Sequence, residues 1–169
     1  MPLTDNFWGS LAGALIAGIV AVFIMIKNFK HDRKLQEISR LHIEIKSANL
    51  LLTGIDTMAN YLESLEYQDY PKTEGDMEAI YSGLRLSHEL IFRVEYNDLP
   101  LEISEEYSKI LRIVNFSTEA ALNSRKGIDD TRANGLLDYA SQLRETAHNL
   151  NLLISKKQKR LKDLDSHSK

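Results

Sequence analysis

The chain has 169 residues, with 21 Lys and Arg against 24 Asp and Glu, so its formal net charge is −3 at pH 7. This mildly acidic balance argues against nucleic acid as a partner, because a nucleic-acid interface needs a basic face. The chain contains no cysteine, which excludes disulfides, cysteine zinc ligands and a thiol nucleophile. The length allows one domain and an anchor.

One unbroken apolar run, residues 7–26, has the sequence FWGSLAGALIAGIVAVFIMI. About 20 apolar residues in a helix are enough to cross a bilayer core about 30 Å thick. A cleaved signal peptide is disfavoured, because residues 1–6 contain Asp5 and no cation, and because the run is longer than such peptides use. A buried core helix is disfavoured, since no side of the run is polar. We therefore predict a single transmembrane helix over residues 7–28.

The cations that follow this run predict its direction across the membrane. Lys27, Lys30, Arg33 and Lys34 come directly after it, whereas residues 1–6 hold no Lys or Arg. Positive charge collects on the cytoplasmic side of membrane helices. We expect residues 1–6 outside the cytosol and the C-terminus inside it, at a plasma membrane or a bacterial inner membrane.

Small side chains recur every four residues inside the run and form a stripe on one helix face. Such a stripe lets two membrane helices approach closely and gain van der Waals contact. A second row of small residues, Ser10, Ala14 and Gly18, makes the pattern less specific. The stripe nevertheless predicts a homo-oligomer that packs through four residues: Gly9, Gly13, Ala17 and Ala21.

The remaining chain is predicted to be helical, because its apolar residues recur at steps of three and four. Breaks at Pro71, Gly75, residues 97–100 and Gly127 divide it into helices of about 31–68, 76–96, 100–126 and 130–164. Four amphipathic helices with short connections predict an all-α fold, in which the transmembrane helix continues into a cytosolic, antiparallel up-down four-helix bundle over 29–165. Residues 166–169 are expected to be a frayed tail.

The first and last of these helices carry coiled-coil-like apolar seams. Gly54 interrupts the first seam and costs about 1 kcal/mol relative to Ala in a helix, so we expect a local weak point there. Lys157 is the one interruption of the last seam. The predicted seam residues are Ile38, Leu41, Ile45, Ala48, Leu52, Ile55, Ala59 and Leu62 in the first helix, and Leu136, Ala140, Leu143, Ala147, Leu150, Ile154, Leu161 and Leu164 in the last.

An up-down bundle returns the end of its fourth helix to the membrane, where we predict a basic collar. Anionic lipid of the inner leaflet contributes about 1 kcal/mol for each nearby cation. The alternative is an ordinary solvated helix end, where cations are favoured by the helix dipole. The collar consists of Lys27, Lys30, Arg33 and Lys34 with Lys156, Lys157, Lys159, Arg160 and Lys162.

Motifs for catalysis or for a cofactor are absent from the sequence: it has no GxGxxG, P-loop, HExxH or GxSxG. Glu145 and His148 form one E-x-x-H pair, but a di-iron bundle site needs two such pairs and two further glutamates. His42 and His88 lie beside seam positions and are expected to be hydrogen-bonded edge residues. We therefore expect no catalytic residues, no metal and no cofactor.

Three tyrosines and several acids gather near the end of the first bundle helix, in the segment YLESLEYQDY. Rigid amphipathic tyrosine is good contact material at protein interfaces. Tyr61, Tyr67 and Tyr70 therefore form a predicted partner-binding tip. The alternative is that these rings cover the end of the core while the acids solvate it.

These features favour a non-enzymatic interaction, scaffold or sensor subunit that a membrane helix anchors, with an unidentified protein partner. One alternative is a small membrane-active effector, such as a phage or plasmid exclusion or immunity factor that acts through its span. A bundle enzyme is less favoured, since it needs inward acids or histidines and the seams are aliphatic or small.

Overall fold

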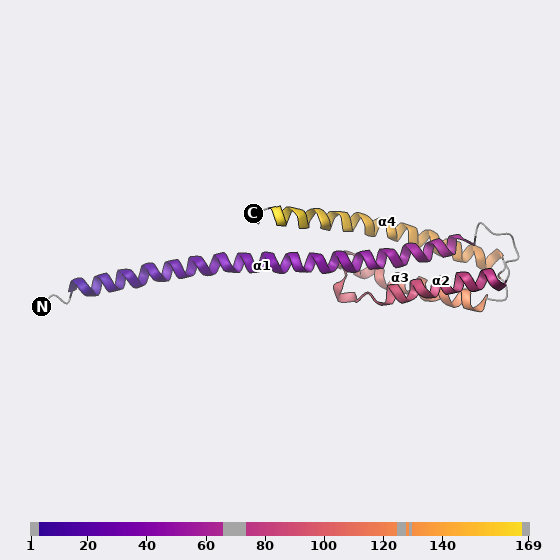
Figure 1. Cartoon of the computed structure of the whole chain (residues 1–169), viewed down its shortest axis with the longest axis horizontal. Helices are drawn as coiled ribbons and strands as arrows, with labels where there is room; N and C mark the ends of the chain where they lie inside the picture. The colour runs from indigo at the N-terminus through magenta and orange to yellow at the C-terminus, as the bar shows by residue number, and fades with distance from the viewer. Residues whose placement is uncertain (1–3, 66–73, 125–127, 129, 167–169) are drawn as a thin grey trace. The chain divides into compact units, whose positions relative to one another are not determined.

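The computed structural model describes residues 4–65, 74–124, 128 and 130–166. These residues are helical and contain no β-strand, so the predicted all-α class is confirmed. The elements in chain order are α1 (Thr4–Glu63), α2 (Glu74–Phe92), the short 3-10 helix η1 (Tyr96–Asp98), α3 (Leu101–Asn123) and α4 (Asp130–Ser166) (Figure 1).

The chain divides into two compact units, residues 1–40 and residues 41–169, which we call the N-terminal unit and the core unit. Helix α1 contributes to both, since it runs unbroken through residue 40. No proline lies between residues 4 and 63, and a helix interior tolerates the other residue types.

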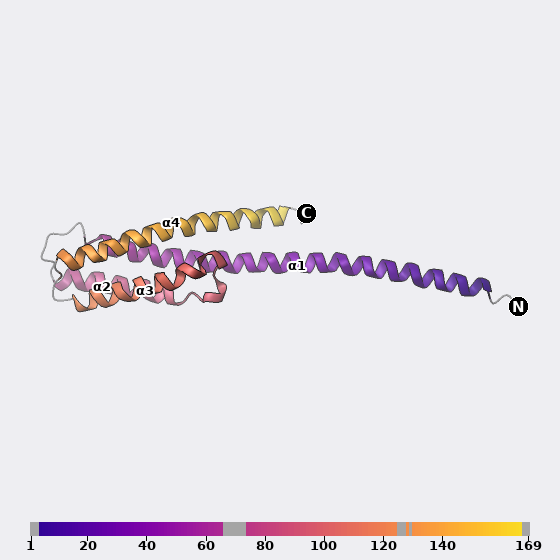
Figure 2. The ribbon, with the colours of Figure 1, turned by 180° about the vertical axis from the view of Figure 1, so that it is seen from behind.

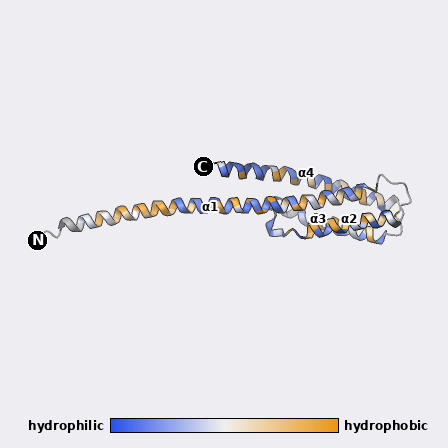
Figure 3. Ribbon diagram, in the orientation of Figure 1, coloured by the Kyte–Doolittle hydropathy of each residue, from blue (hydrophilic) through white to orange (hydrophobic). Residues whose placement is uncertain are grey.

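In the N-terminal unit, α1 exposes its apolar side chains. The most apolar 18-residue window of this helix has a mean hydropathy of 2.4, and none of it is buried. Figure 3 shows a mostly orange stretch in the N-terminal part of α1, and mostly blue residues follow it. The helix is long and apolar enough to cross a membrane, whereas the core helix of a soluble protein would be largely buried.

The core unit is built around one cluster of buried side chains. In both ribbon views, α2, α3 and α4 lie alongside the part of α1 that follows residue 40 (Figures 1 and 2). Each of these helices supplies fully or almost fully buried aliphatic residues, and among the largest are Leu51, Met58 and Leu62 of α1, Leu84 and Ile91 of α2, Ile110 of α3, and Leu136, Leu143 and Leu150 of α4.

In the two long helices, the predicted seam residues agree only in part with the residues that are buried. In α4 the six predicted seam residues from Leu136 to Ile154 are buried, whereas Leu161 and Leu164, beyond Lys157, are only partly buried. In α1, the predicted seam residues Ile38, Ile45 and Leu52 are only partly buried. Beside the last two, the neighbours Glu44 and Leu51 are the buried residues. Most buried positions of α1 after residue 40 follow a heptad pattern: Leu41, Glu44, Ala48, Leu51, Ile55, Met58 and Leu62. Ala59 is buried beside this pattern, and Leu65 continues it in the turn that follows α1.

Two glycines bring α1 and α2 close together. A Cβ on Gly54 of α1 would lie 2.6 Å from Cγ1 of Ile91, and a Cβ on Gly83 of α2 would overlap the ring of Tyr61. Each glycine therefore accepts a large side chain of the opposite helix. The predicted weak point at Gly54 is not a break in the structure: α1 continues through it, and the missing side chain makes room for Ile91.

Tyr107 of α3 holds the end of α2. Its hydroxyl donates to the carbonyl oxygens of Val94 at 2.9 Å and Ile91 at 3.2 Å, and the Ile91 carbonyl also accepts from the N–H of Val94. Burial raises the pKa of the Tyr107 hydroxyl. Helix α2 therefore ends at Phe92, before the predicted residue 96, and η1 carries the chain to Pro100, which precedes α3.

Candidate functional site

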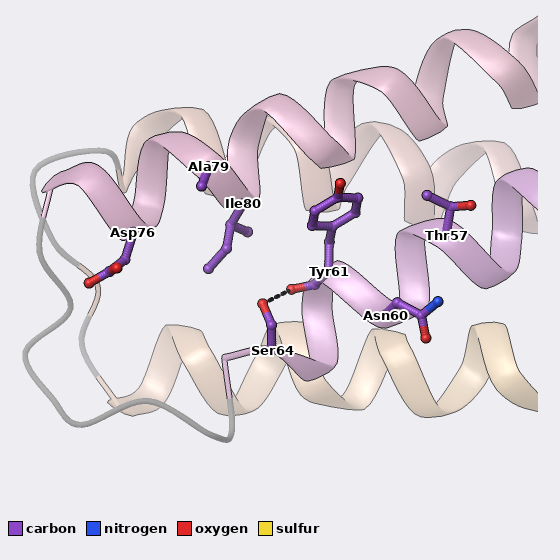
Figure 4. A pocket seen from close by; sticks show the side chains of 7 residues that line it. All are labelled: Thr57, Asn60, Tyr61, Ser64, Asp76, Ala79 and Ile80. Carbon is purple, nitrogen blue, oxygen red and sulfur yellow. Dashed lines mark hydrogen bonds between the residues drawn. The ribbon is translucent and has the colours of Figure 1, made fainter.

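A hollow of about 440 Å³ opens between the end of α1 and the start of α2 (Figure 4). Tyr61 of the predicted partner-binding tip lines it. The lining residues are Thr57, Asn60, Tyr61 and Ser64 from α1, and Asp76, Ala79 and Ile80 from α2.

Tyr61 is the one predicted tip residue whose position is described; Tyr67 and Tyr70 lie outside the described residues. Its ring is directed from α1 toward α2 in Figure 4 and packs, partly buried, against the core cluster. Gly83 makes this position available, because any side chain there would meet the ring. The sequence offered a signal for this contact only in the isolated Gly inside the second helical pattern.

Hydroxyl oxygens form part of the polar wall of the hollow. The hydroxyl of Thr57 donates to the carbonyl of Thr53 at 2.7 Å, and that of Ser64 donates to the carbonyl of Tyr61 at 2.7 Å. Each oxygen keeps lone pairs that can accept from a ligand or a partner. Since both hydroxyls give their protons to backbone carbonyls, the arrangement suits hydrogen bonding to these oxygens.

An arginine of α4 forms hydrogen bonds with α1 residues on this side of the hollow. Arg144 binds Glu63 through two hydrogen bonds, Nε to Oε1 at 2.8 Å and Nη2 to Oε2 at 2.7 Å. Its Nη1 donates to Oδ1 of Asp56 at 3.0 Å, and Nη2 also donates to the amide oxygen of Asn60, which lines the hollow. The hydrogen bonds from Arg144 lower the pKa of Glu63, and the same hydrogen bonds raise the pKa of Arg144. A bidentate pair of this kind fixes geometry more strongly than a single contact.

A second charged cluster lies at the other end of the core unit. Nζ of Lys157 in α4 lies 2.8 Å from Oε2 of Glu44 in α1 and 3.4 Å from Oε2 of Glu102 in α3. The Lys157 side chain is only 14 % exposed, and that of Glu44 only 6 %. The seam pattern in the sequence singled out Lys157 as an interruption, but it did not predict that Glu44 is buried. The available signal was the heptad step that places Glu44 between Leu41 and Ala48.

The other residues of the predicted basic collar are exposed or partly exposed. Lys27, Lys30 and Arg33 are exposed and Lys34 is partly exposed in the N-terminal unit. In the core unit, Lys157 differs from its neighbours because its ammonium group is turned to the two glutamates. The four cations of α4 that stay exposed are Lys156, Lys159, Arg160 and Lys162.

The predicted membrane-packing stripe lies open on α1. A Cβ on Gly9 or Gly13 would meet no atom within 4 Å, and Ala17 and Ala21 are exposed. The stripe is therefore available for contact with another helix.

The histidines do not form a metal centre in the described part of the chain, where no group of three or more His, Cys, Asp or Glu residues could hold an ion. His148 is exposed on α4. His88 lies 2.9 Å, through Nε2, from the amide oxygen of Asn115 and stacks on Phe92, which makes it an edge residue that links α2 to α3.

Two buried serines, Ser117 of α3 and Ser124 directly after this helix, are unusual for a helical core. Their hydroxyl oxygens are buried and have no hydrogen-bond partner among the residues that the structure describes. By contrast, the hydroxyl of Ser87 in α2 donates to the carbonyl of Gly83 at 2.9 Å. An unpaired buried hydroxyl lowers stability.

Comparisons of the chain with protein-family models, with curated proteins and with solved structures give no match.

Proposed function

We propose that the chain is a single-pass membrane protein that acts as a non-enzymatic interaction, scaffold or sensor subunit on the cytosolic face. The observation that carries this proposal is α1: one helix supplies an exposed apolar run up to Ile26 and, from Leu41 onward, part of a buried core. A helix of this kind links a membrane segment to a folded unit without a break in the chain. The cations after Ile26 support an orientation with residues 1–6 outside the cytosol.

The fold proposed for the core unit is an antiparallel up-down four-helix bundle. Its support is the order of contacts between neighbouring helices, because the residue number rises on one helix as it falls on the other. This holds for α1 with α2 (Gly54 by Ile91, Tyr61 by Gly83), for α1 with α4 (Glu44 by Lys157, Asp56 by Arg144) and for α3 with α4 (Glu102 by Lys157, Phe116 by Tyr139).

The partner-binding place in this proposal is the hollow beside Tyr61. It combines an aromatic ring, hydroxyl oxygens and two apolar side chains, Ala79 and Ile80, at the surface of the core unit. Mixed apolar and hydrogen-bonding surfaces of this kind are typical of protein interfaces. The hydroxyls donate to carbonyls rather than to a base, which favours binding over catalysis.

Lipid and a second copy of the chain are the other proposed partners. The exposed cations Lys156, Lys159, Arg160 and Lys162 suit anionic inner-leaflet headgroups. Lys157 is left out of the proposed lipid-binding set, because Glu44 holds it. The open stripe at Gly9 and Gly13 supports packing of two spans.

Site-specific photo-crosslinking in intact membranes tests the partner proposal. A photoreactive residue at Thr57, in the hollow, should yield one discrete adduct with another protein. The same residue at Lys109, exposed on α3, is the matched control and should not yield it. An adduct pattern that is the same from both positions would contradict the proposed partner site.

Cysteine accessibility tests the orientation, since the chain has no cysteine of its own. Thr4→Cys should react with a membrane-impermeant maleimide in intact cells, whereas Ser141→Cys should react only after lysis. The reverse pattern would contradict the proposed topology.

A graft separates the proposal from the alternative of a membrane-active effector. Residues 1–40 are fused to an unrelated soluble domain. If the phenotype of the full chain is lost, the core unit is required, as proposed. If the phenotype is kept, the span alone is active.

A further inference from the structure

A charged pair inside an apolar heptad seam is the feature of the core unit that helix packing alone does not explain. Glu44 occupies a heptad position of α1 between Leu41 and Ala48, and it is 5 % exposed. Lys157 follows Ile154 of α4 by the same three-residue step. Both charges therefore stand where the pattern calls for aliphatic side chains, and their oxygen and nitrogen atoms lie 2.8 Å apart.

The apolar part of the α4 seam repeats itself every seven residues. Its buried alanines are Ala133, Ala140 and Ala147, and its buried leucines are Leu136, Leu143 and Leu150. Moving α4 along α1 by seven residues would still place an alanine at two of the three alanine positions and a leucine at two of the three leucine positions. Packing of these side chains therefore discriminates weakly between the observed register and a slipped one.

The charged pair, by contrast, favours the observed register over a slipped one. In the observed register Glu44 lies opposite Lys157, and Asp56 lies opposite Arg144. A slip of seven residues would bring Glu44 opposite Leu150 in one direction and opposite Leu164 in the other. Either slip would leave a buried carboxylate against an apolar side chain, which is strongly unfavourable.

We propose that the Glu44–Lys157 pair fixes the register of α4 against α1, with Glu102 of α3 as a third member. A single buried polar residue in a coiled-coil seam has the same effect on register and partner choice. The role differs from simple stabilisation, because replacing a buried ion pair by apolar residues often leaves stability unchanged or raises it.

The test replaces both charges and reads the register by crosslinking in the full-length chain in detergent micelles. The variant is Glu44→Leu with Lys157→Leu. Cysteines at Leu52 and His148 report the observed register. Cysteines at Leu52 and Ser155, or at Leu52 and Ser141, report the two slipped registers. The native chain should crosslink only through the first pair.

In the double-leucine variant we expect unchanged helical content, a thermal midpoint that is equal or higher, and new crosslinking at one or both slipped pairs. The matched control removes an exposed charged pair of α2, Arg85→Met with Glu89→Met, and should crosslink only in the observed register. The reversed pair, Glu44→Lys with Lys157→Glu, should restore a single register.

Crosslinking of the double-leucine variant only through Leu52 and His148 would overturn the proposal. Loss of its helical content would also overturn it, because the pair would then hold the fold rather than choose between registers. Slipped crosslinks in the reversed-pair variant would have the same consequence, since that variant keeps both charges opposite each other.

Discussion

The two parts of α1 on either side of residue 40 belong to one helix but distribute their apolar side chains differently. Residues 7–26 are apolar on every side, and the described side chains from Trp8 to Ile26 are all exposed. Residues 41–63 place apolar side chains at heptad positions and bury them against three other helices. A continuous apolar surface suits lipid, whereas a stripe suits a protein core. The periodicity of the apolar residues, rather than their number alone, therefore decides what a helix packs against.

The largest expected effect contrasts a leucine from each part of α1. Leu62→Ala removes a fully buried side chain and should lower the free energy of unfolding of the core unit by about 2–5 kcal/mol, because a cavity remains. Leu15→Ala removes an exposed side chain and should leave that free energy unchanged. Urea titrations in detergent, followed by circular dichroism, measure both. Equal effects would break the contrast between the two parts.

A charge in the first part of α1 gives the next largest effect. Val20→Lys places an ammonium group in the middle of the apolar run, which costs about 2.5–3.5 kcal/mol in membrane insertion. The variant should move from the membrane fraction to the soluble or degraded fraction in cell fractionation. Lys46→Arg, in the second part, is the control and should stay with the membrane. Retention of Val20→Lys in the membrane would argue against a spanning helix.

The buried serines Ser117 and Ser87 differ in hydrogen bonding, so their alanine variants should differ in stability. Ser117→Ala removes a hydroxyl without a partner and should raise the free energy of unfolding by about 1 kcal/mol. Ser87→Ala is the matched variant; it removes a hydroxyl that donates to Gly83 and should give no such gain. Thermal unfolding followed by circular dichroism compares them. A loss of stability in Ser117→Ala would show that its hydroxyl has a partner, such as an ordered water.

The smallest expected effect is a change in the stability of the core unit at acid pH. Arg144 lowers the pKa of Glu63, so this carboxylate contributes stability that is fully present above its ordinary pKa of 4.5. That contribution is lost as the pH falls below this value, through the lowered pKa of the folded state. Arg144→Gln should therefore flatten the acid limb of a plot of stability against pH. Arg85→Gln, which loses an exposed contact with Glu89, should keep the native limb.

How far the sequence alone reaches can be seen from particular residues. The steps of three and four in residues 136–154 predicted the buried face of α4 correctly, because helical spacing is a local property. The same method chose Ile45 over Glu44 in α1, since it does not expect a charge in a seam. Only the position of Lys157 on another helix makes Glu44 acceptable inside the core. In the candidate site, Tyr61 was predicted, whereas Asn60, Gly83 and Arg144 were found only from their contacts.

By itself the sequence determined the all-helical class, the apolar run at residues 7–26 and the buried face of α4 from Leu136 to Ile154. These depend on local periodicity and composition, which each segment carries on its own. The tertiary structure decided which helices meet at Gly54 and Gly83, how Arg144 braces the hollow and why Lys157 interrupts its seam. Those features depend on residues far apart in the chain, and nothing within one helix records the partner on the next.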